Sequence, residues 1–177
     1  MANLWNFGKY RCKLWPKKYW QTQGLNADMK LSKNFSLREM TKSQTALRMG
    51  ISNTPTIDKI QNLKALCENV LQPVRDHYDR PVTITSGYRC EELCEAIGSK
   101  ATSQHALGQA ADFEIAGISN FGLAEWIAQN CDFDQLILEF YTGGNTGWVH
   151  CSYAPDPRGQ TLTYDKDNGY RKGLIDA

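Results

Sequence analysis

The chain has 177 residues, of which 41% are hydrophobic and 11% aromatic, and this size and composition indicate one globular domain with a sizeable core. Twenty lysines and arginines against 19 acidic residues give a formal net charge of +1, which argues neither for a nucleic-acid binder nor for an acidic solubilising protein. The sequence lacks a run of 18 consecutive apolar residues, so it predicts no transmembrane segment.

The first residues show neither the apolar core nor the cleavage site of a signal peptide. We therefore expect synthesis in the cytoplasm without a signal peptide, and any substrate outside the cell must be reached by another route. The six cysteines lack the dense spacing of a small disulfide scaffold and predict reduced packing residues. They are Cys12, Cys67, Cys90, Cys94, Cys131 and Cys151.

Residues 1–30 differ from the remainder in charge and composition. Six basic residues oppose only Asp28, a local balance of +6 − 1 = +5, and six aromatic residues are interleaved with them. We interpret 1–30 as a basic aromatic N-terminal arm and 31–177 as the main domain. Such an arm suits an anionic polymer, a membrane surface or a partner protein, although it could equally fold back onto its own domain.

The sequence of the first half of the main domain predicts helices. Ser36 is typical of an N-cap, with Glu39 three residues later, and this helix is expected to end at Gly50. A long amphipathic helix is expected to open at Pro55, with a kink near Pro73. Shorter helices are predicted over 91–97 and 119–130.

Strands are predicted over 81–85, 111–115, 135–140 and 148–153, because β-branched residues and two-residue alternation dominate there. The elements together predict an α+β fold, in which a small antiparallel sheet packs against several helices. A turn near 143–146 should join the last two strands in a hairpin that sets Glu139 opposite His150.

Two of the chain's three histidines, His105 and His150, stand in segments that also supply the carboxylate Asp112. Two imidazoles and one carboxylate fill three corners of a zinc tetrahedron at about 2.0–2.2 Å and leave the fourth for water, which is the hydrolytic arrangement. Each residue also has a plain structural explanation, since strand histidines are often merely hydrogen-bonded and Asp112 could cap a turn. Their coincidence at one end of the expected sheet favours a zinc site.

The residues around this site also resemble a known family. The segments 86–89 (SGYR), 103–112 (SQHALGQAAD) and 148–150 (WVH) are similar to the zinc-dependent D-Ala-D-Ala carboxypeptidase family, which includes VanY-type enzymes, phage endolysin peptidases and the hedgehog-like zinc fold. The likeness extends over about 31–177 and is greatest to a phage and bacterial branch. It implies His105, Asp112 and His150 as zinc ligands and a peptidoglycan stem peptide as substrate.

The resemblance also implies that Arg89 engages a carboxylate or carbonyl oxygen of the substrate, although a salt bridge with Glu91 or Glu92 is the alternative. Further residues expected to contact substrate have structural alternatives, in a turn or in the core. They are Ser86, Gln104 and Trp148.

One departure from the family concerns the general base. Related enzymes often carry a glutamate three residues before the last histidine, where this chain has Gly147. Glu139 is therefore the expected catalytic base, with Glu114 as second choice. Cys90 and Cys94 also stand where similar sequences tend to have Ser and Asn.

These observations predict a zinc-dependent peptidase that hydrolyses peptidoglycan stem peptides or cross-links, encoded by a phage or prophage. It would act at the bacterial cell wall after release or be carried in a virion, with 1–30 contacting other virion proteins. The alternative is a non-catalytic zinc-fold protein of a virion, attached through the arm. Nucleic acid is not an expected partner, because the excess of positive charge stops near residue 30.

Overall fold

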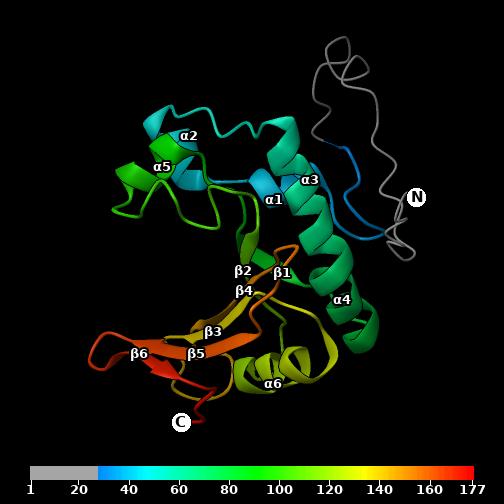
Figure 1. Ribbon diagram of the computed structural model, residues 1–177, viewed down its shortest axis with the longest axis vertical. Coiled ribbons are helices and arrows are strands. Elements are labelled where there is room, and N and C mark those ends of the chain that lie inside the picture. Colours follow the sequence, from blue (N-terminus) through cyan, green and yellow to red (C-terminus); the bar gives the residue numbers. More distant parts are fainter. Residues whose placement is uncertain (1–27) are drawn as a thin grey trace, which may run out of the picture.

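The computed structural model of the chain describes residues 28–177, so the predicted basic arm lies outside the described residues except for its last three. The described part has the α+β fold expected from the sequence, with a six-stranded sheet and helices packed against it (Figure 1). None of its helices has the length and apolar character needed to cross a bilayer.

The sheet has the strand order β1-β2-β4-β3-β5-β6 and is antiparallel except where β3 pairs with β5. Its strands are β1 Thr83–Ser86, β2 Ala110–Glu114, β3 Gln135–Glu139, β4 Trp148–Ser152, β5 Gln160–Asp165 and β6 Gly169–Lys172. The helical segments are α1 Leu37–Thr41, α2 Gln44–Met49, α3 Ile57–Leu66, η2 Cys67–Leu71, α4 Gln72–Tyr78, α5 Glu91–Ala96 and α6 Asn120–Asn130.

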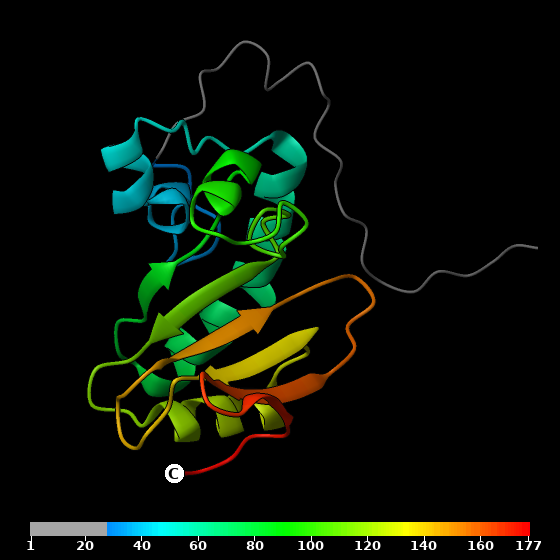
Figure 2. The same cartoon turned by 90° about the vertical axis from the view of Figure 1, so that its left-hand side faces the viewer.

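The two faces of the sheet have different surroundings, because successive side chains of a strand point to opposite sides. Phe113, Leu138 and Val149 point to one side and are fully buried in a core shared with α3, η2, α4 and α6. These helices lie behind the strands in Figure 2. The opposite face carries Asp112 and His150, and it is this face that holds the candidate site.

The helix expected from Ser36 to Gly50 is two helices, so that prediction was wrong in its length. Ser36 caps α1 as expected, and its hydroxyl accepts a hydrogen bond from the Glu39 backbone N–H. The chain becomes extended at Lys42, and Ser43 then caps α2 by accepting from the Ala46 N–H. A second capping serine offers the backbone a new helix start and ends the first helix early.

The long amphipathic helix is present, but it begins at Ile57 with Thr56 as its N-cap, so Pro55 lies just outside it. Before Pro73 the helix widens into the π-helical segment η2, where the Gln72 N–H donates to the Cys67 carbonyl. A proline cannot donate and crowds the preceding turn, so the irregularity expected there takes the form of a π turn.

The predicted hairpin of β3 and β4 is present with a register two residues away from the expected one. Glu139 pairs with Trp148, and His150 pairs with Ile137, so the prediction that Glu139 stands opposite His150 was wrong. Pairing stops at Glu139 because Phe140 and Gly147 both have left-handed backbone, with φ of 54° and 66°. A shift of two residues preserves the face, so Glu139 and His150 still point to the same side.

A buried carboxylate fastens three separate segments of the domain together. Asp134, just before β3, accepts two hydrogen bonds from the Arg158 guanidinium, at 2.8 and 2.6 Å, and one from the Gln104 amide at 2.7 Å. The hydrogen bonds from Arg158 lower the pKa of the Asp134 carboxyl most, and the one from Gln104 lowers it further. The pKa is about 2, although burial alone would raise it. The carboxylate thereby ties the loop before β2 and the β4–β5 connection to the start of β3.

The lowered pKa of Asp134 predicts a pH-dependent contribution to stability. A carboxyl whose pKa falls from 3.8 to about 2 on folding stabilises the protein above pH 4, and the contribution is lost as the pH falls through 2. Asp134→Asn should lower the free energy of unfolding at pH 7 by about 1–2 kcal/mol after allowing for the solvent exposure of Arg158. Urea unfolding of both proteins at pH 7 and pH 2.5 measures this. A difference that stays constant across that range contradicts the assignment.

Candidate metal centre

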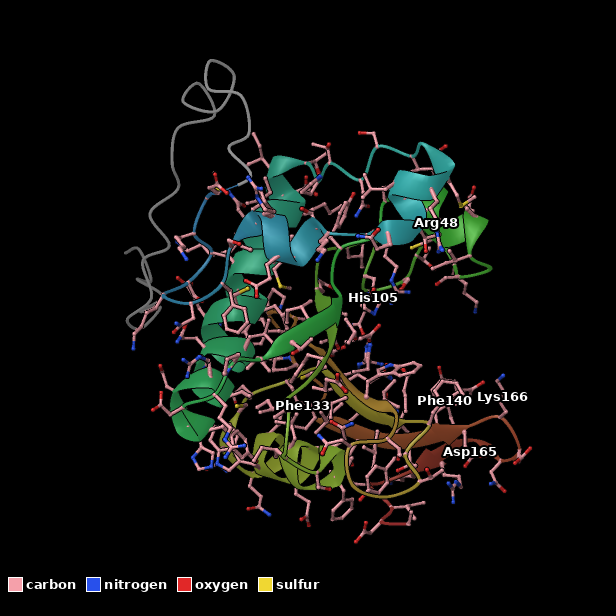
Figure 3. All side chains as sticks on the ribbon, turned by 180° about the vertical axis from the view of Figure 1, so that it is seen from behind. Arg48, His105, Phe133, Phe140, Asp165 and Lys166 are labelled. Carbon is pink, nitrogen blue, oxygen red and sulfur yellow. The ribbon has the colours of Figure 1, made fainter. Side chains whose placement is uncertain are left out.

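Three buried side chains converge on the open face of the sheet. Asp112 on β2 and His150 on β4 are direct cross-strand partners, and His105 lies in the loop before β2, central in Figure 3. The distances are 2.8 Å from His150 Nδ1 to Asp112 Oδ1, 3.3 Å from His105 Nε2 to the same oxygen, and 3.2 Å between the two nitrogens. They are the predicted ligand residues, and they form a group that could hold a metal ion.

The spacing of these ligand atoms fits zinc. Zinc bonds of about 2.0–2.1 Å in a tetrahedron give edges of about 3.4 Å between neighbouring ligand atoms. Two of the three observed separations, 3.2 and 3.3 Å, are close to such an edge, and the third, 2.8 Å, is shorter. With two imidazole nitrogens and one carboxylate oxygen, the donor set is also that of zinc sites with a vertex open for catalysis.

The loop that carries His105 is fixed by tight backbone packing. His105 Nδ1 lies 2.7 Å from the Gly87 carbonyl oxygen, which favours the tautomer that leaves Nε2 as a ligand. Gly87 and Gly108 each lie against another backbone, where an added Cβ would be 2.2 Å from the Met40 oxygen and 2.6 Å from the Lys59 oxygen. Only glycine permits these approaches, so both residues help to aim the imidazole.

Arg89 extends over the group from the segment after β1. Its Nη2 lies 2.7 Å from Asp112 Oδ2, and its Nε donates to the Ser86 hydroxyl at 2.8 Å. The ion pair is therefore with Asp112 and not with Glu91 or Glu92, which follow it in sequence. Asp112 thus presents one oxygen to the two imidazoles and the other to Arg89.

The protonation states of the group suit metal binding. Burial by itself would raise the pKa of the Asp112 carboxyl, but the contacts with His105 and His150 outweigh it and hold that pKa well below its ordinary value. Burial lowers the pKa of His105 in spite of the neighbouring Asp112. The carboxylate is therefore anionic and the His105 imidazole neutral near pH 7, as metal ligands must be.

The group lies in a cleft of about 620 Å³ between the sheet face and the loop over 99–105. Among the residues expected to contact substrate, Arg89, Gln104 and Trp148 line this cleft. Ser86 lines a neighbouring cavity of about 530 Å³ that shares Arg89 with it. Tyr170, from the C-terminal hairpin, also lines the metal cleft and was not anticipated, although the Asp-Asn-Gly turn at 167–169 is a hairpin signal.

Of the two candidate bases, Glu139 lines the cleft beside the metal group. Burial, followed by the charge of Asp112, raises the pKa of the Glu139 carboxyl above its ordinary value. A carboxylate with a raised pKa is a better proton acceptor near neutral pH. Glu114 pairs with Thr83 toward the outer end of β2 and does not belong to the described lining of the cleft.

Gly147 cannot be exchanged for the glutamate found in related enzymes without moving the backbone. It has φ of 66°, and an added Cβ would lie 2.0 Å from the Glu139 carbonyl oxygen and 2.6 Å from the Phe140 carbonyl carbon. The tight end of the β3–β4 hairpin therefore requires glycine at this position. A base must come from another element, and Glu139 is the described carboxylate that lines the cleft next to the three predicted ligands.

Gly147→Ala is expected to destabilise the protein by about 2 kcal/mol or more, because both the left-handed backbone and the clash oppose a side chain. Gly144→Ala is the matched control: its φ of 59° is similar, but nothing lies within 4 Å of the added Cβ, so only about 1 kcal/mol should be lost. Denaturant unfolding measures both. Equal losses would show that the close approach at Gly147 is relieved without cost.

Two imidazoles and a carboxylate that meet in a cleft on one face of a mixed sheet are the arrangement typical of zinc hydrolases. The chain matches the model of the Peptidase M15 family over residues 33–152, which is more than half of its length. The protein therefore belongs to the peptidase M15 family, whose members are zinc-dependent, and the family resemblance seen in the sequence is confirmed. The search of curated proteins found no match.

Zinc binding is expected to depend on the three converging residues. His105→Ala or Asp112→Asn should weaken zinc affinity by more than about 100-fold, since loss of an outer hydrogen-bond partner of a ligand already costs 10–100-fold. His77→Ala is the matched control, because this histidine stacks on Trp126 in the helical layer. Metal analysis after dialysis gives the stoichiometry. Unchanged zinc content in either ligand variant would contradict the site.

Proposed function

We propose that the protein is a zinc peptidase that hydrolyses peptide bonds of peptidoglycan stem peptides or cross-links. The observation that carries the proposal is the buried group of His105, Asp112 and His150 at a cleft that also contains Glu139. Membership of the peptidase M15 family supports a metallopeptidase acting on a peptidoglycan-like substrate.

The residues of the cleft have separate roles in the proposed hydrolysis. A zinc ion held by the three ligands would supply Lewis acidity toward a scissile carbonyl group and toward water. Glu139, on the same face of the sheet as His150, takes a proton from the attacking water and passes it to the departing amine. The raised pKa of Glu139 suits both halves of this transfer.

Arg89 binds the substrate in this proposal. Its Nε is held by Ser86 and its Nη2 by Asp112, with His105 Nε2 also 3.0 Å from Nη2, whereas Nη1 makes no hydrogen bond to the described part of the chain. A planar guanidinium fixed in this way offers its remaining donors to a carboxylate or to the oxygen that gains charge during hydrolysis. Ser86 then acts by holding Arg89 in place, and Gln104 and Trp148 shape the cleft around the peptide.

The biological setting of this proposal is a phage or prophage. The sequence is similar to phage-type peptidases of the family, and a basic aromatic arm over 1–30 suits attachment to the wall or to other virion proteins. We infer that the chain is made in the cytoplasm and reaches the cell wall either after release as a lysin or as part of a virion.

A second candidate function is a non-catalytic zinc-fold protein of a virion, attached through the arm. The observation that favours it is Gly147 at the position where related enzymes often have their catalytic glutamate. In this reading the zinc ion stabilises the fold and the cleft only binds its ligand. A protein that retains zinc but releases no fragments from sacculi would establish this second function.

The proposed base is tested with purified sacculi and mass spectrometry of the released muropeptides. Glu139→Gln should keep zinc and lower turnover by about 10²–10⁴-fold, the usual contribution of a general base. Glu114→Gln, on β2 and outside the described cleft lining, is the matched control and should retain turnover. Chelation of zinc should abolish release by the wild type. Retained activity in Glu139→Gln with loss in Glu114→Gln would transfer the role to Glu114.

A further inference from the structure

The C-terminal hairpin adds a surface to the metal cleft that lies beyond the family match. The match ends at residue 152, whereas β5 and β6 follow it. One row of cross-strand partners nevertheless crosses from the matched region into the hairpin: Trp148 pairs with Glu139, Glu139 with Tyr164, and Tyr164 with Tyr170. Paired residues share a face, so both tyrosines stand on the side of the sheet that carries the metal group.

Four aromatic rings form a continuous ladder along this row. Ring centroids are 5.0 Å apart between Trp148 and Phe140, 5.2 Å between Phe140 and Tyr164, and 4.6 Å between Tyr164 and Tyr170. Phe140 would point to the opposite face in a regular strand, but its left-handed backbone, with φ of 54°, lets the ring join the row. Figure 3 shows Phe140 near the hairpin end marked by Asp165 and Lys166.

The outer end of the ladder is accessible to a ligand. Tyr170 is 64% exposed and at the same time lines the cleft that contains the metal group. Polar side chains line other parts of the same cleft: Gln135, at the opposite end of β3, hydrogen-bonds to Gln160 at 2.7 Å. The result is an exposed aromatic ring continuous with a cleft whose lining includes the amides of Gln104 and Gln135.

The chemistry of this surface favours an uncharged ring over an acidic peptide. A sugar ring presents C–H groups on one face, which pack on an aromatic face, and hydroxyl and acetamido groups at its rim, which bind polar side chains. A carboxylate-bearing residue of a stem peptide would instead meet the Glu139 carboxylate in the same row.

We propose that Tyr170, supported by Tyr164, is a saccharide subsite that binds an N-acetylated amino sugar of the glycan strand carrying the stem peptide. The choice of this glycan rests on the proposed function. The hairpin outside the family match then recognises the strand to which the scissile peptide is attached, and the protein prefers glycan-linked stems to free peptides.

The test uses the zinc-loaded full chain and the tetramer of N-acetylglucosamine, with binding measured by calorimetry. Tyr170→Ala should weaken binding about three- to tenfold, the range expected for one aromatic contact. Tyr170→Phe should retain binding, because it keeps the ring. Leu47→Ala is the control for a lost exposed apolar side chain, since Leu47 is 73% exposed on α2, and it should bind as the wild type does. Thermal unfolding and zinc content confirm that each variant is folded.

A second measurement compares hydrolysis of stem peptides with and without their disaccharide. The wild type should show a higher kcat/KM on the disaccharide-linked peptide, and Tyr170→Ala should reduce that ratio. Absence of tetramer binding by the wild type, equal binding by Tyr170→Ala, or an equal loss on both substrates would overturn the saccharide subsite; the last would indicate a peptide occupant. Tetramer binding without hydrolysis would instead count against the proposed function and leave the subsite standing.

Discussion

The metal centre is organised around one buried negative charge. The Asp112 side chain is only 10% exposed, and a carboxylate so enclosed is unfavourable unless it is paired and hydrogen-bonded. Its partners come from three separate segments: His105 from a loop, Arg89 from the chain after β1, and His150 from β4. Satisfying this carboxylate therefore brings together the groups that chemistry at the site needs, so stability of the fold and formation of the site are the same requirement.

The division of the sheet into two faces explains how a small domain provides both a core and a cleft. Helices pack against the core side of the central strands, and the other face is left for the metal group, with the loop over 99–105 as the second wall. Glycines at 87, 108 and 147 hold backbones against one another at the edges of this cleft. Each removes a side chain where two segments must touch, and so the positions of the functional residues are fixed by contacts between main chains.

The sequence predicted the parts of the structure that depend on local periodicity. Alternation located β2, β3 and β4, and it assigned Asp112, His150 and Glu139 to one face. The register of the hairpin was wrong because it depends on the left-handed backbone at Phe140, a bulky residue that gives no such signal. The ion pair of Arg89 also lies beyond sequence reasoning, since two nearby glutamates compete with an aspartate 23 residues away.

The hairpin of β5 and β6 has a protective effect apart from any ligand. β5 hydrogen-bonds along the whole length of β3, on the side away from β4. A fragment ending at Ser152 would leave the N–H and C=O groups on one side of β3 without partners. Such an exposed edge strand can pair with strands of other molecules and cause aggregation. β6, which becomes the outermost strand on that side, is only four residues long and ends in Lys172, a charge that discourages pairing with another copy. The same addition thus keeps the sheet from growing.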